Sequence, residues 1–178
     1  MGWYQKEHGV TSELLASCEG KRIIDVGAGA TTLVQLLIDK EYKVTVLDIS
    51  SKALEILSAR HGDAVEYKIG DLSSQLQLDE YDIWHDRAVL HFLLDEKDYQ
   101  SYVSNLESCI PVGGFAIIET FSTDGAEMCC GLKLRRYSED MLVDLLGNNW
   151  QLLRSISHVY TNPSGGKRPY ISTVFKRK

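Results

Sequence analysis

The sequence of 178 residues has no long apolar run and no excess of basic residues. Its strongly apolar stretches are a few residues long, and residues 1–8 show no apolar segment behind a basic start. We therefore expect neither a membrane span nor a secretory signal. Asp and Glu number 25 against 19 Lys and Arg, which gives a net charge of −6. An acidic chain is a poor partner for a polyanion, so we expect no nucleic-acid partner.

The four cysteines also lack the CxxC spacing that is typical of metal and redox sites. We interpret Cys18, Cys109, Cys129 and Cys130 as free thiols of a cytoplasmic protein, and we expect no bound metal. Hydrophobic residues make up 44% of the chain, which is enough for one core of normal size but not for two. We therefore predict a single domain.

Strand-like and helix-like segments alternate through the first two thirds of the chain. Short runs rich in β-branched residues predict strands at residues 22–26, 43–47, 65–69, 82–84 and 115–120. Helical patterns lie near residues 11–18 and, between the strands, at residues 31–40, 51–61 and about 86–109. This alternation is typical of an α/β fold, in which helices cover both faces of a parallel sheet.

The last third of the chain has a different pattern. A predicted helix at residues 138–146 is followed by two long strand-like segments, at residues 150–160 and 168–176. The link between these segments reads TNPSGGK, and its Asn-Pro and Gly-Gly pairs are typical of a turn. The sheet is therefore expected to end in an antiparallel pair.

The stretch RIIDVGAGATTL at residues 22–33 predicts a strand, a tight turn and the start of a helix. Gly27 and Gly29, with Ala28 between them, carry no Cβ and let the backbone approach a ligand closely. Amide N–H groups at the start of the next helix point toward a ligand at the same place. The turn therefore predicts a nucleoside cofactor site.

Acidic residues stand at the ends of four predicted strands: Asp25, Asp48, Asp71 and Asp86. In an open α/β sheet the ligand lies beyond these carboxyl ends. Asp48 follows Gly27 by 21 residues, the spacing at which a carboxylate accepts hydrogen bonds from the hydroxyls of a ribose. This excludes a ribose 2′-phosphate but leaves NAD and other adenosine ligands open.

Thr32 stands where a dinucleotide-binding fingerprint has its third glycine. No Lys or Arg lies between Asp25 and Gln35, so the turn offers no cation to a diphosphate. The acids at Asp25 and Asp71 instead favour a cationic ligand. S-Adenosylmethionine has this character, because it carries a sulfonium and an ammonium group beside its ribose and adenine.

Taken together, these motifs resemble the class I S-adenosylmethionine-dependent methyltransferases. The resemblance implies a seven-stranded Rossmann-like sheet over residues 21–178, mostly parallel, with a C-terminal antiparallel hairpin. The family's first motif corresponds to Asp25, Gly27, Ala28 and Gly29, with Ala30 in place of its usual third glycine. The cofactor is then S-adenosylmethionine and the product S-adenosylhomocysteine.

The resemblance also assigns the other cofactor contacts. Asp48 matches the ribose-binding acid, and Ile49 is expected against the adenine ring. The segment Gly70, Asp71 and Leu72 matches the one that receives the adenine amino group. Residues 1–20 are expected to fold over the cofactor as a lid, with Tyr4 near the sulfonium, unless these aromatic residues only anchor the terminus.

The end of the fourth strand is expected to face the methyl acceptor. The run YDIWHDRAVLHFL resembles, over a short stretch, the WDRGAL-type segment of small-molecule thiol methyltransferases. On that basis Asp86 lines the methyl-transfer site, Arg87 steadies it or binds an acidic group of the acceptor, and His85 is a further candidate. The alternative is that Asp86 and Arg87 only cap the next helix and form a local ion pair.

The segment at residues 120–138 is expected to roof the acceptor pocket. Its adjacent thiols, Cys129 and Cys130, are interpreted as unpaired, with a soft metal or metalloid site or a methyl relay as alternatives. Arg135 and Arg136 either select an anionic acceptor or are solvated. His91 is interpreted as a packed residue, as is His158, and a role at the acceptor is the alternative for both.

The resemblance thus predicts an S-adenosylmethionine-dependent methyltransferase, without a metal, that methylates a small molecule at sulfur or nitrogen and is a monomer or homodimer. Two alternatives stay open. One is a protein methyltransferase, although the chain lacks the NPPY or DPPY tetrapeptide that often follows the fourth strand in amino-group methyltransferases. The other is a subunit that binds S-adenosylmethionine without performing chemistry.

Overall fold

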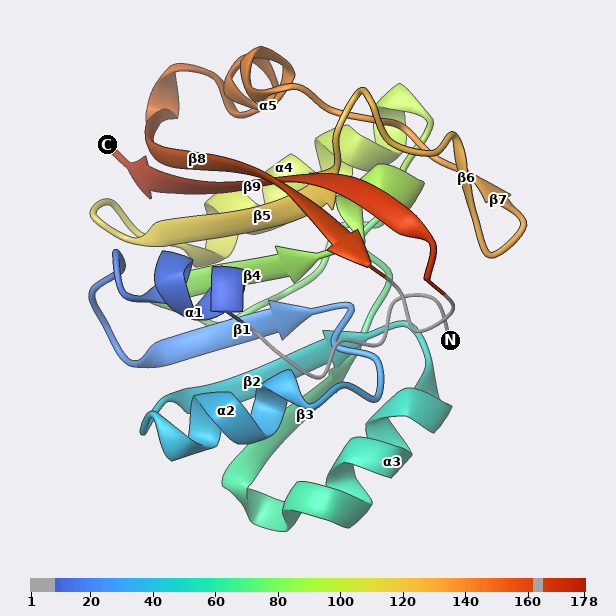
Figure 1. The fold of residues 1–178 in the computed structure, drawn as a ribbon. Helices are drawn as coiled ribbons and strands as arrows, with labels where there is room; N and C mark the ends of the chain where they lie inside the picture. The colour runs from blue at the N-terminus through green and yellow to red at the C-terminus, as the bar shows by residue number, and fades with distance from the viewer. Residues whose placement is uncertain (1–8, 162–164) are drawn as a thin grey trace.

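The computed structural model describes residues 9–161 and 165–178. Seven strands form one sheet in the order β3-β2-β1-β4-β5-β9-β8 (Figure 1). Strands β1 to β5 are parallel, whereas β9 is antiparallel to both β5 and β8. The predicted parallel sheet with a C-terminal antiparallel hairpin is confirmed. The bounds are β1 Arg22–Val26, β2 Lys43–Asp48, β3 Val65–Ile69, β4 Ile83–Arg87, β5 Phe115–Phe121, β8 Trp150–Thr161 and β9 Lys167–Arg177.

Helices cover both faces of the sheet (Figure 1). One face packs against α1 (Gly9–Leu15), α2 (Leu33–Asp39) and α3 (Ser51–His61), and the other against α4 (Glu96–Cys109) and α5 (Glu139–Leu146). Ile117 and Ile118, adjacent on β5, belong to different cores because side chains alternate along a strand. Both faces are therefore apolar, which explains the unbroken hydrophobic runs of the central strands. Within the described ranges, no helix is long and apolar enough to cross a membrane.

The strand order reverses between β1 and β4. The chain leaves β1 toward β2 and β3 on one side, and later returns to place β4 on the other side of β1. In such a sheet a crevice opens beyond the carboxyl ends of these two strands. The glycine turn after β1 and the segment after β4 therefore face the same crevice, as the sequence predicted.

Strand β4 is longer than the sequence indicated. It runs to Arg87 rather than ending at Trp84, because its pairing with β5 continues to Arg87 opposite Glu119. The chain then turns at Ala88, with φ of 76°, and forms a short 3-10 turn at Leu90–Phe92 before α4 begins at Glu96. His85 and Asp86 consequently lie inside the sheet and not in the loop beyond it.

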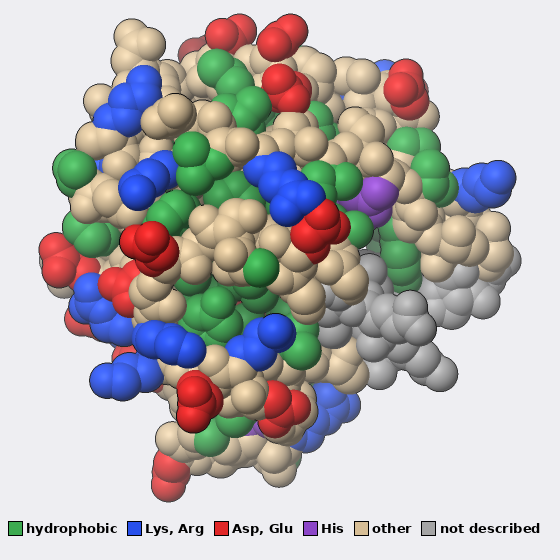
Figure 2. Space-filling view, turned by 60° about the vertical axis from the view of Figure 1, so that its left-hand side comes forward, with side chains coloured by type: hydrophobic (Ala, Val, Ile, Leu, Met, Phe, Trp, Pro, Cys, Tyr) green, Lys and Arg blue, Asp and Glu red, His purple; other side chains and the backbone are tan. Residues whose placement is uncertain are grey.

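A small hairpin, β6 (Met128–Cys129) and β7 (Leu132–Lys133), was not predicted. Its two-residue turn places Cys130 and Gly131 at φ of 54° and 82°, the positive values that a tight hairpin turn of this kind requires. In Figure 1 the hairpin stands beyond the carboxyl ends of the central strands. In the view of Figure 2, basic and acidic side chains are interspersed over the visible face of the molecule.

Candidate active site

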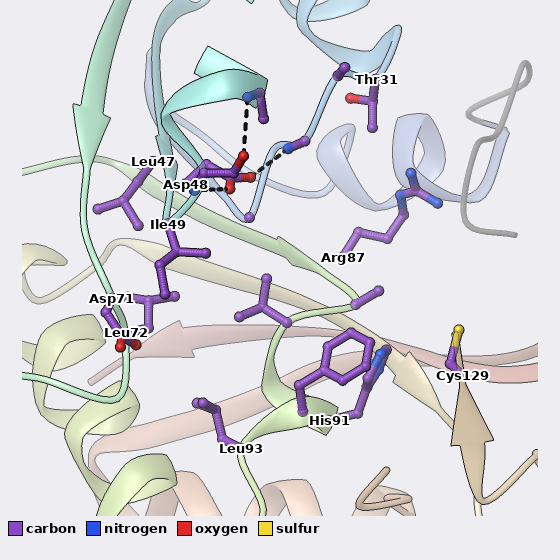
Figure 3. Close-up of a pocket in the computed structure, with 18 of the residues that line it drawn as sticks. Thr31, Leu47, Asp48, Ile49, Asp71, Leu72, Arg87, His91, Leu93 and Cys129 are labelled. Atoms are coloured by element: carbon purple, nitrogen blue, oxygen red, sulfur yellow. Dashed lines mark hydrogen bonds between the residues drawn. The ribbon is translucent and has the colours of Figure 1, made fainter. Parts of the chain in front are cut away.

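A cavity of about 580 Å³ opens beyond the carboxyl ends of β1, β2 and β4. Of the expected site residues, its lining includes Gly27, Gly29, Asp48, Ile49, Gly70, Asp71, Leu72 and Arg87. In Figure 3 Asp48, Ile49 and Asp71 lie at one end of the cavity, and Arg87, His91 and Cys129 at the other. We call these the cofactor end and the acceptor end.

Gly27 closes the turn after β1 in a conformation that favours glycine. Its φ is +62°, and its N–H donates to the carbonyl of Leu47 at 2.7 Å. A Cβ on Gly27 would stand 2.0 Å from Cγ2 of Val89, which also lines the cavity. The glycine is therefore required both by the backbone conformation and by the close approach of the segment after β4.

The carboxylate of Asp48 holds the glycine turn against the start of α3. Its Oδ2 accepts the Gly29 N–H at 2.8 Å, and its Oδ1 accepts the Ser50 N–H at 2.8 Å (Figure 3). Each carboxylate oxygen has a second lone pair. Asp48 can therefore brace the loop and still accept hydrogen bonds from the hydroxyls of a ribose at the cavity wall.

Apolar side chains lie beside this carboxylate. Ile49 is 67% exposed although it lines the cavity, and Leu72 forms part of the wall nearby. Asp71 accepts hydrogen bonds from the N–H and the hydroxyl of Ser73 at 2.9 and 2.7 Å. An exposed isoleucine in a cavity suits the flat face of an adenine ring, which would remove it from water.

Thr31 supplies a further observation on the ligand. It is buried, it lines the cavity, and within the described residues its hydroxyl has no hydrogen-bond partner. A buried hydroxyl without a partner is costly and is satisfied when a polar ligand group arrives. The residues of the cofactor end thus fit S-adenosylmethionine, which offers a ribose, an adenine and a polar amino-acid group.

Asp25 and His85 occupy a different place from the one expected. They lie opposite each other on β1 and β4, inside the sheet, and neither lines the cavity. His85 is fully buried; its Nδ1 is 2.6 Å from Oδ1 of Asp25, and its Nε2 is 3.2 Å from Oε1 of Glu119. Thr11 and Ser172 donate hydrogen bonds to Glu119 at 2.6 and 2.9 Å. These five residues form a buried polar network behind the glycine turn.

The histidine offsets part of the negative charge of this network. Burial by itself would lower the pKa of His85, but hydrogen bonds and attraction from Asp25 and Glu119 raise it to about 9. Burial would raise the pKa of Glu119, but His85, Thr11 and Ser172 lower it to about 2. His85 is therefore an imidazolium at neutral pH, held between two carboxylates.

We expect the free energy of unfolding to fall as the pH rises from 6.5 to about 9. The folded-state pKa of His85, about 9, lies above the value near 6.5 of an unfolded chain, so its contribution is full below pH 6.5 and is lost by about pH 9. Urea titrations across this range measure the slope. The His85→Gln variant should remove it, and an equal slope in that variant would contradict the assignment.

Asp86 is also placed behind the cavity rather than in it. It is fully buried, and its carboxylate accepts the N–H groups of Val89 at 2.8 Å and Leu90 at 3.0 Å. Burial raises its pKa to about 6. Asp86 therefore caps the turn after β4 rather than the next helix, α4, and among the described residues no ion pair joins it to Arg87. Ala28 is likewise packed in the core, and both placements differ from the expected contacts with ligands.

The acceptor end of the cavity contains residues that the sequence did not predict as site residues: His91, Phe92, Phe121, Cys129, Arg168 and Tyr170. For His91 and Cys129 a functional role was the alternative to a purely structural one. No sequence pattern pointed to Phe121, Arg168 or Tyr170. The last two come from β9, which the antiparallel hairpin inserts beside β5. Their position depends on this long-range strand pairing.

The remaining candidates that the structure describes contact other residues of the protein, and among them only Cys129 lines the cavity. His158 contacts Ser172 at 2.9 Å, Arg135 stacks on Tyr99 at 4.1 Å from the ring centroid, and Arg136 pairs with Glu127 at 3.0 Å. The sulfurs of Cys129 and Cys130 are 3.8 Å apart, and no metal-binding group of three or more ligands occurs in the described part of the chain. Tyr4 lies outside the described residues, as do residues 1–8 of the expected lid.

Comparison with known proteins agrees with this geometry. A family model described as a methyltransferase domain matches residues 24–116. No curated protein matches the chain. Among solved structures, a SAM-dependent methyltransferase from Methanosarcina mazei is 18% identical, with 97% of this chain and 99% of that chain covered and a TM-score of 0.78.

Two further structures have named activities. The N-methyltransferase NodS from Bradyrhizobium japonicum is 14% identical over 96% of this chain and 93% of its own, with a TM-score of 0.76. The 1,6-didemethyltoxoflavin-N1-methyltransferase from Burkholderia thailandensis, with its substrate and S-adenosylhomocysteine bound, is 19% identical over 96% of this chain and 74% of its own, with a TM-score of 0.71. At these identities the likeness shows the fold.

The family model covers about half of the chain, from β1 to the start of β5, and so includes the glycine turn, Asp48 and the segment after β4. The chain belongs to the methyltransferase domain family, and it is a class I S-adenosylmethionine-dependent methyltransferase.

Proposed function

We propose that this methyltransferase acts on a small molecule, at nitrogen or sulfur, in the acceptor end of the cavity. The observation that carries the proposal is the cavity itself: a volume of about 580 Å³ has room for the cofactor and one compact acceptor. The acceptor end is walled by side chains of β4, β5, β6 and β9 together with the turn after β4. The N-methyltransferase with bound 1,6-didemethyltoxoflavin is a structural neighbour that acts on such a molecule.

In this proposal the cofactor end binds and orients. Asp48 accepts the ribose hydroxyls, Ile49 and Leu72 pack on the adenine, and the glycine turn leaves room for the amino-acid end near Thr31. S-Adenosylmethionine, when bound, supplies an electrophilic methyl group together with its leaving group. The protein's main task is then to align the acceptor atom with that methyl and to exclude water.

The buried residues support this alignment from behind. Asp86 fixes the turn that carries Val89 and His91, because two backbone N–H groups of that turn donate to its carboxylate. Asp25 and His85 hold β1 and β4 together where the glycine turn begins. We therefore assign Asp25, His85 and Asp86 as positioning residues and keep Arg87, which lines the cavity, as a candidate for acceptor contact.

The Asp48→Ala variant is expected to bind S-adenosylhomocysteine about 100-fold more weakly than the wild type. The change removes charged hydrogen-bond acceptors for the ribose and releases the Gly29 N–H, and hydrogen bonds to charged groups contribute roughly 1.5–3 kcal/mol each. Isothermal titration calorimetry measures the affinity. The exposed Asp63→Ala variant is the control, and thermal melting checks that Asp48→Ala is folded. Unchanged affinity in folded Asp48→Ala would contradict the site.

The choice of acceptor class has its own test. Release of S-adenosylhomocysteine is measured with a panel of small amines, thiols and nitrogen heterocycles, and separately with a protein extract. We expect turnover above the solvent background with at least one small molecule. Turnover that occurs only with the protein fraction would overturn the small-molecule proposal while leaving the cofactor site intact.

A further inference from the structure

The two ends of the cavity differ in charge. The acids in the lining, Asp48 and Asp71, lie at the cofactor end. At the acceptor end, the lining within the described residues includes Arg87 and Arg168 but no acid. Both arginines are half-buried, and Arg168 has no ion-pair partner among the described residues. Because the described lining of this end carries cations without acids, we expect it to favour an anionic acceptor.

The walls at this end are aromatic. Phe92, Phe121 and Tyr170 line the cavity, and the rings of Phe121 and Tyr170 are 4.7 Å apart between centroids. Phe92 is 36% exposed, which is high for a phenylalanine packed beside a buried histidine. Aromatic faces are best covered by a flat ring that stacks on them or meets them edge to face. These walls therefore select a planar acceptor.

His91 provides the specific polar contact. Its side chain is fully buried, and its ring lies 4.5 Å from that of Phe92 and 4.9 Å from that of Phe121. Its Nδ1 is 3.2 Å from Oγ1 of Thr120, whereas its Nε2 has no hydrogen-bond partner in the described part of the chain. A histidine that only packed in the core would have both nitrogens satisfied. The free Nε2 is therefore a contact reserved for a ligand.

The chemical state of His91 determines which contact this is. Burial lowers its pKa to about 3, so the ring is neutral at physiological pH. Among the described residues, the other charged and titratable groups of the acceptor end are Arg87, Arg168, Cys129 and Tyr170, and none of them is a carboxylate that would stabilise an imidazolium. The contact between Nδ1 and Oγ1 of Thr120 is compatible with either neutral tautomer of His91. In the tautomer with the proton on Nδ1, Nε2 carries a lone pair. For that tautomer, the matching ligand group is a hydrogen-bond donor.

We infer that His91 carries its proton on Nδ1 and that the acceptor is a planar aromatic anion with a ring N–H. This acceptor stacks between the aromatic walls, donates its N–H to Nε2 of His91 and places its anionic group near Arg168. This inference rests on the proposed function and names the substrate class of the same site. The donor requirement distinguishes the acceptor from other flat anions. His91 is then a specificity-determining residue, and so is Arg168.

Three probes test the inference in the wild-type protein. Indole-2-carboxylate carries both the ring N–H and the anion, benzofuran-2-carboxylate lacks the N–H, and indole-2-carboxamide lacks the charge. Calorimetric titrations are made with and without S-adenosylhomocysteine. We expect indole-2-carboxylate to bind at least tenfold more tightly than either of the others. Equal or tighter binding of the benzofuran acid would overturn the donor contact, and equal binding of the carboxamide would overturn the anion contact.

Two variants locate the contacts. In His91→Phe, which keeps an aromatic ring at this position, the advantage of indole-2-carboxylate over benzofuran-2-carboxylate should disappear. In Arg168→Gln the advantage of indole-2-carboxylate over indole-2-carboxamide should shrink about tenfold, while the N–H preference remains. In ¹⁵N spectra of the free protein, Nε2 of His91 should be the unprotonated nitrogen. A protonated Nε2, or unchanged preferences in the variants, would overturn the assignment.

The outcomes separate this inference from the proposed function. Binding of S-adenosylhomocysteine without any preference among the probes would leave the methyltransferase site intact and overturn the acceptor class. The expected ranking of probes without binding of S-adenosylhomocysteine would support the subsite and contradict the cofactor site.

Discussion

The His85→Leu variant is expected to lose about 3–5 kcal/mol of unfolding free energy, or to fail to fold. The substitution removes the imidazolium that Asp25 and Glu119 share in the middle of the sheet, at 2.6 and 3.2 Å. It leaves two carboxylates buried without a cation, and removal of one partner from a buried ion pair typically costs this much. Urea denaturation followed by circular dichroism measures the loss.

A compensating variant shows whether charge is the cause. The triple variant His85→Leu with Asp25→Asn and Glu119→Gln removes both uncompensated charges while it keeps the size of the side chains. It should recover part of the lost stability. A loss below about 1 kcal/mol in His85→Leu, the size of an ordinary neutral hydrogen bond, would show that His85 is not charged in the folded state.

The Gly27→Ala variant is expected to abolish measurable binding of S-adenosylhomocysteine and to destabilise the fold by about 2–4 kcal/mol. A non-glycine residue at positive φ costs roughly 1–2 kcal/mol, and an overpacked side chain typically costs another 1–3 kcal/mol. Here the added methyl would meet Cγ2 of Val89 at 2.0 Å, and both residues line the cavity. Calorimetry and thermal melting measure the two effects.

Gly113 provides the matched control. Its φ is +90°, but a Cβ built on it has no atom within 4 Å. Gly113→Ala should therefore carry the backbone cost without the steric one and should leave cofactor binding unchanged. The double variant Gly27→Ala with Val89→Ala should regain part of the stability. If Gly27→Ala binds the cofactor as the wild type does, the turn does not contact it.

The network around His85 and the clash at Gly27 concern the same small region. Asp25 lies in the buried part of β1, two residues before Gly27, and Asp86 on β4 caps the turn that carries Val89. The two strand ends are thus fixed by buried polar contacts, and the glycine turn and the turn after β4 are packed together between them. Substitutions in this region are expected to affect stability and cofactor affinity together.

The sequence by itself determined the features that depend on local chemistry. Alternating β-branched and helical segments predicted the α/β order, and the turn residues of TNPSGGK predicted the antiparallel hairpin. The two glycines and the spacing to Asp48 predicted the cofactor end of the cavity, because a tight turn and a strand end are set by a few neighbouring residues. The resemblance to class I methyltransferases followed from the same motifs and is confirmed by the family match.

Only the tertiary structure decided the acceptor end. The length of β4 depends on its pairing with β5. The sequence therefore could not show that His85 and Asp86 lie within the sheet while His91 lines the cavity. Arg168 and Tyr170 are far from β4 along the chain and reach the cavity because β9 is inserted antiparallel between β5 and β8. Pairing between strands that are distant in the chain leaves no pattern in the residues next to Arg168 and Tyr170. For this reason the acceptor end of the cavity could be described only from the tertiary structure.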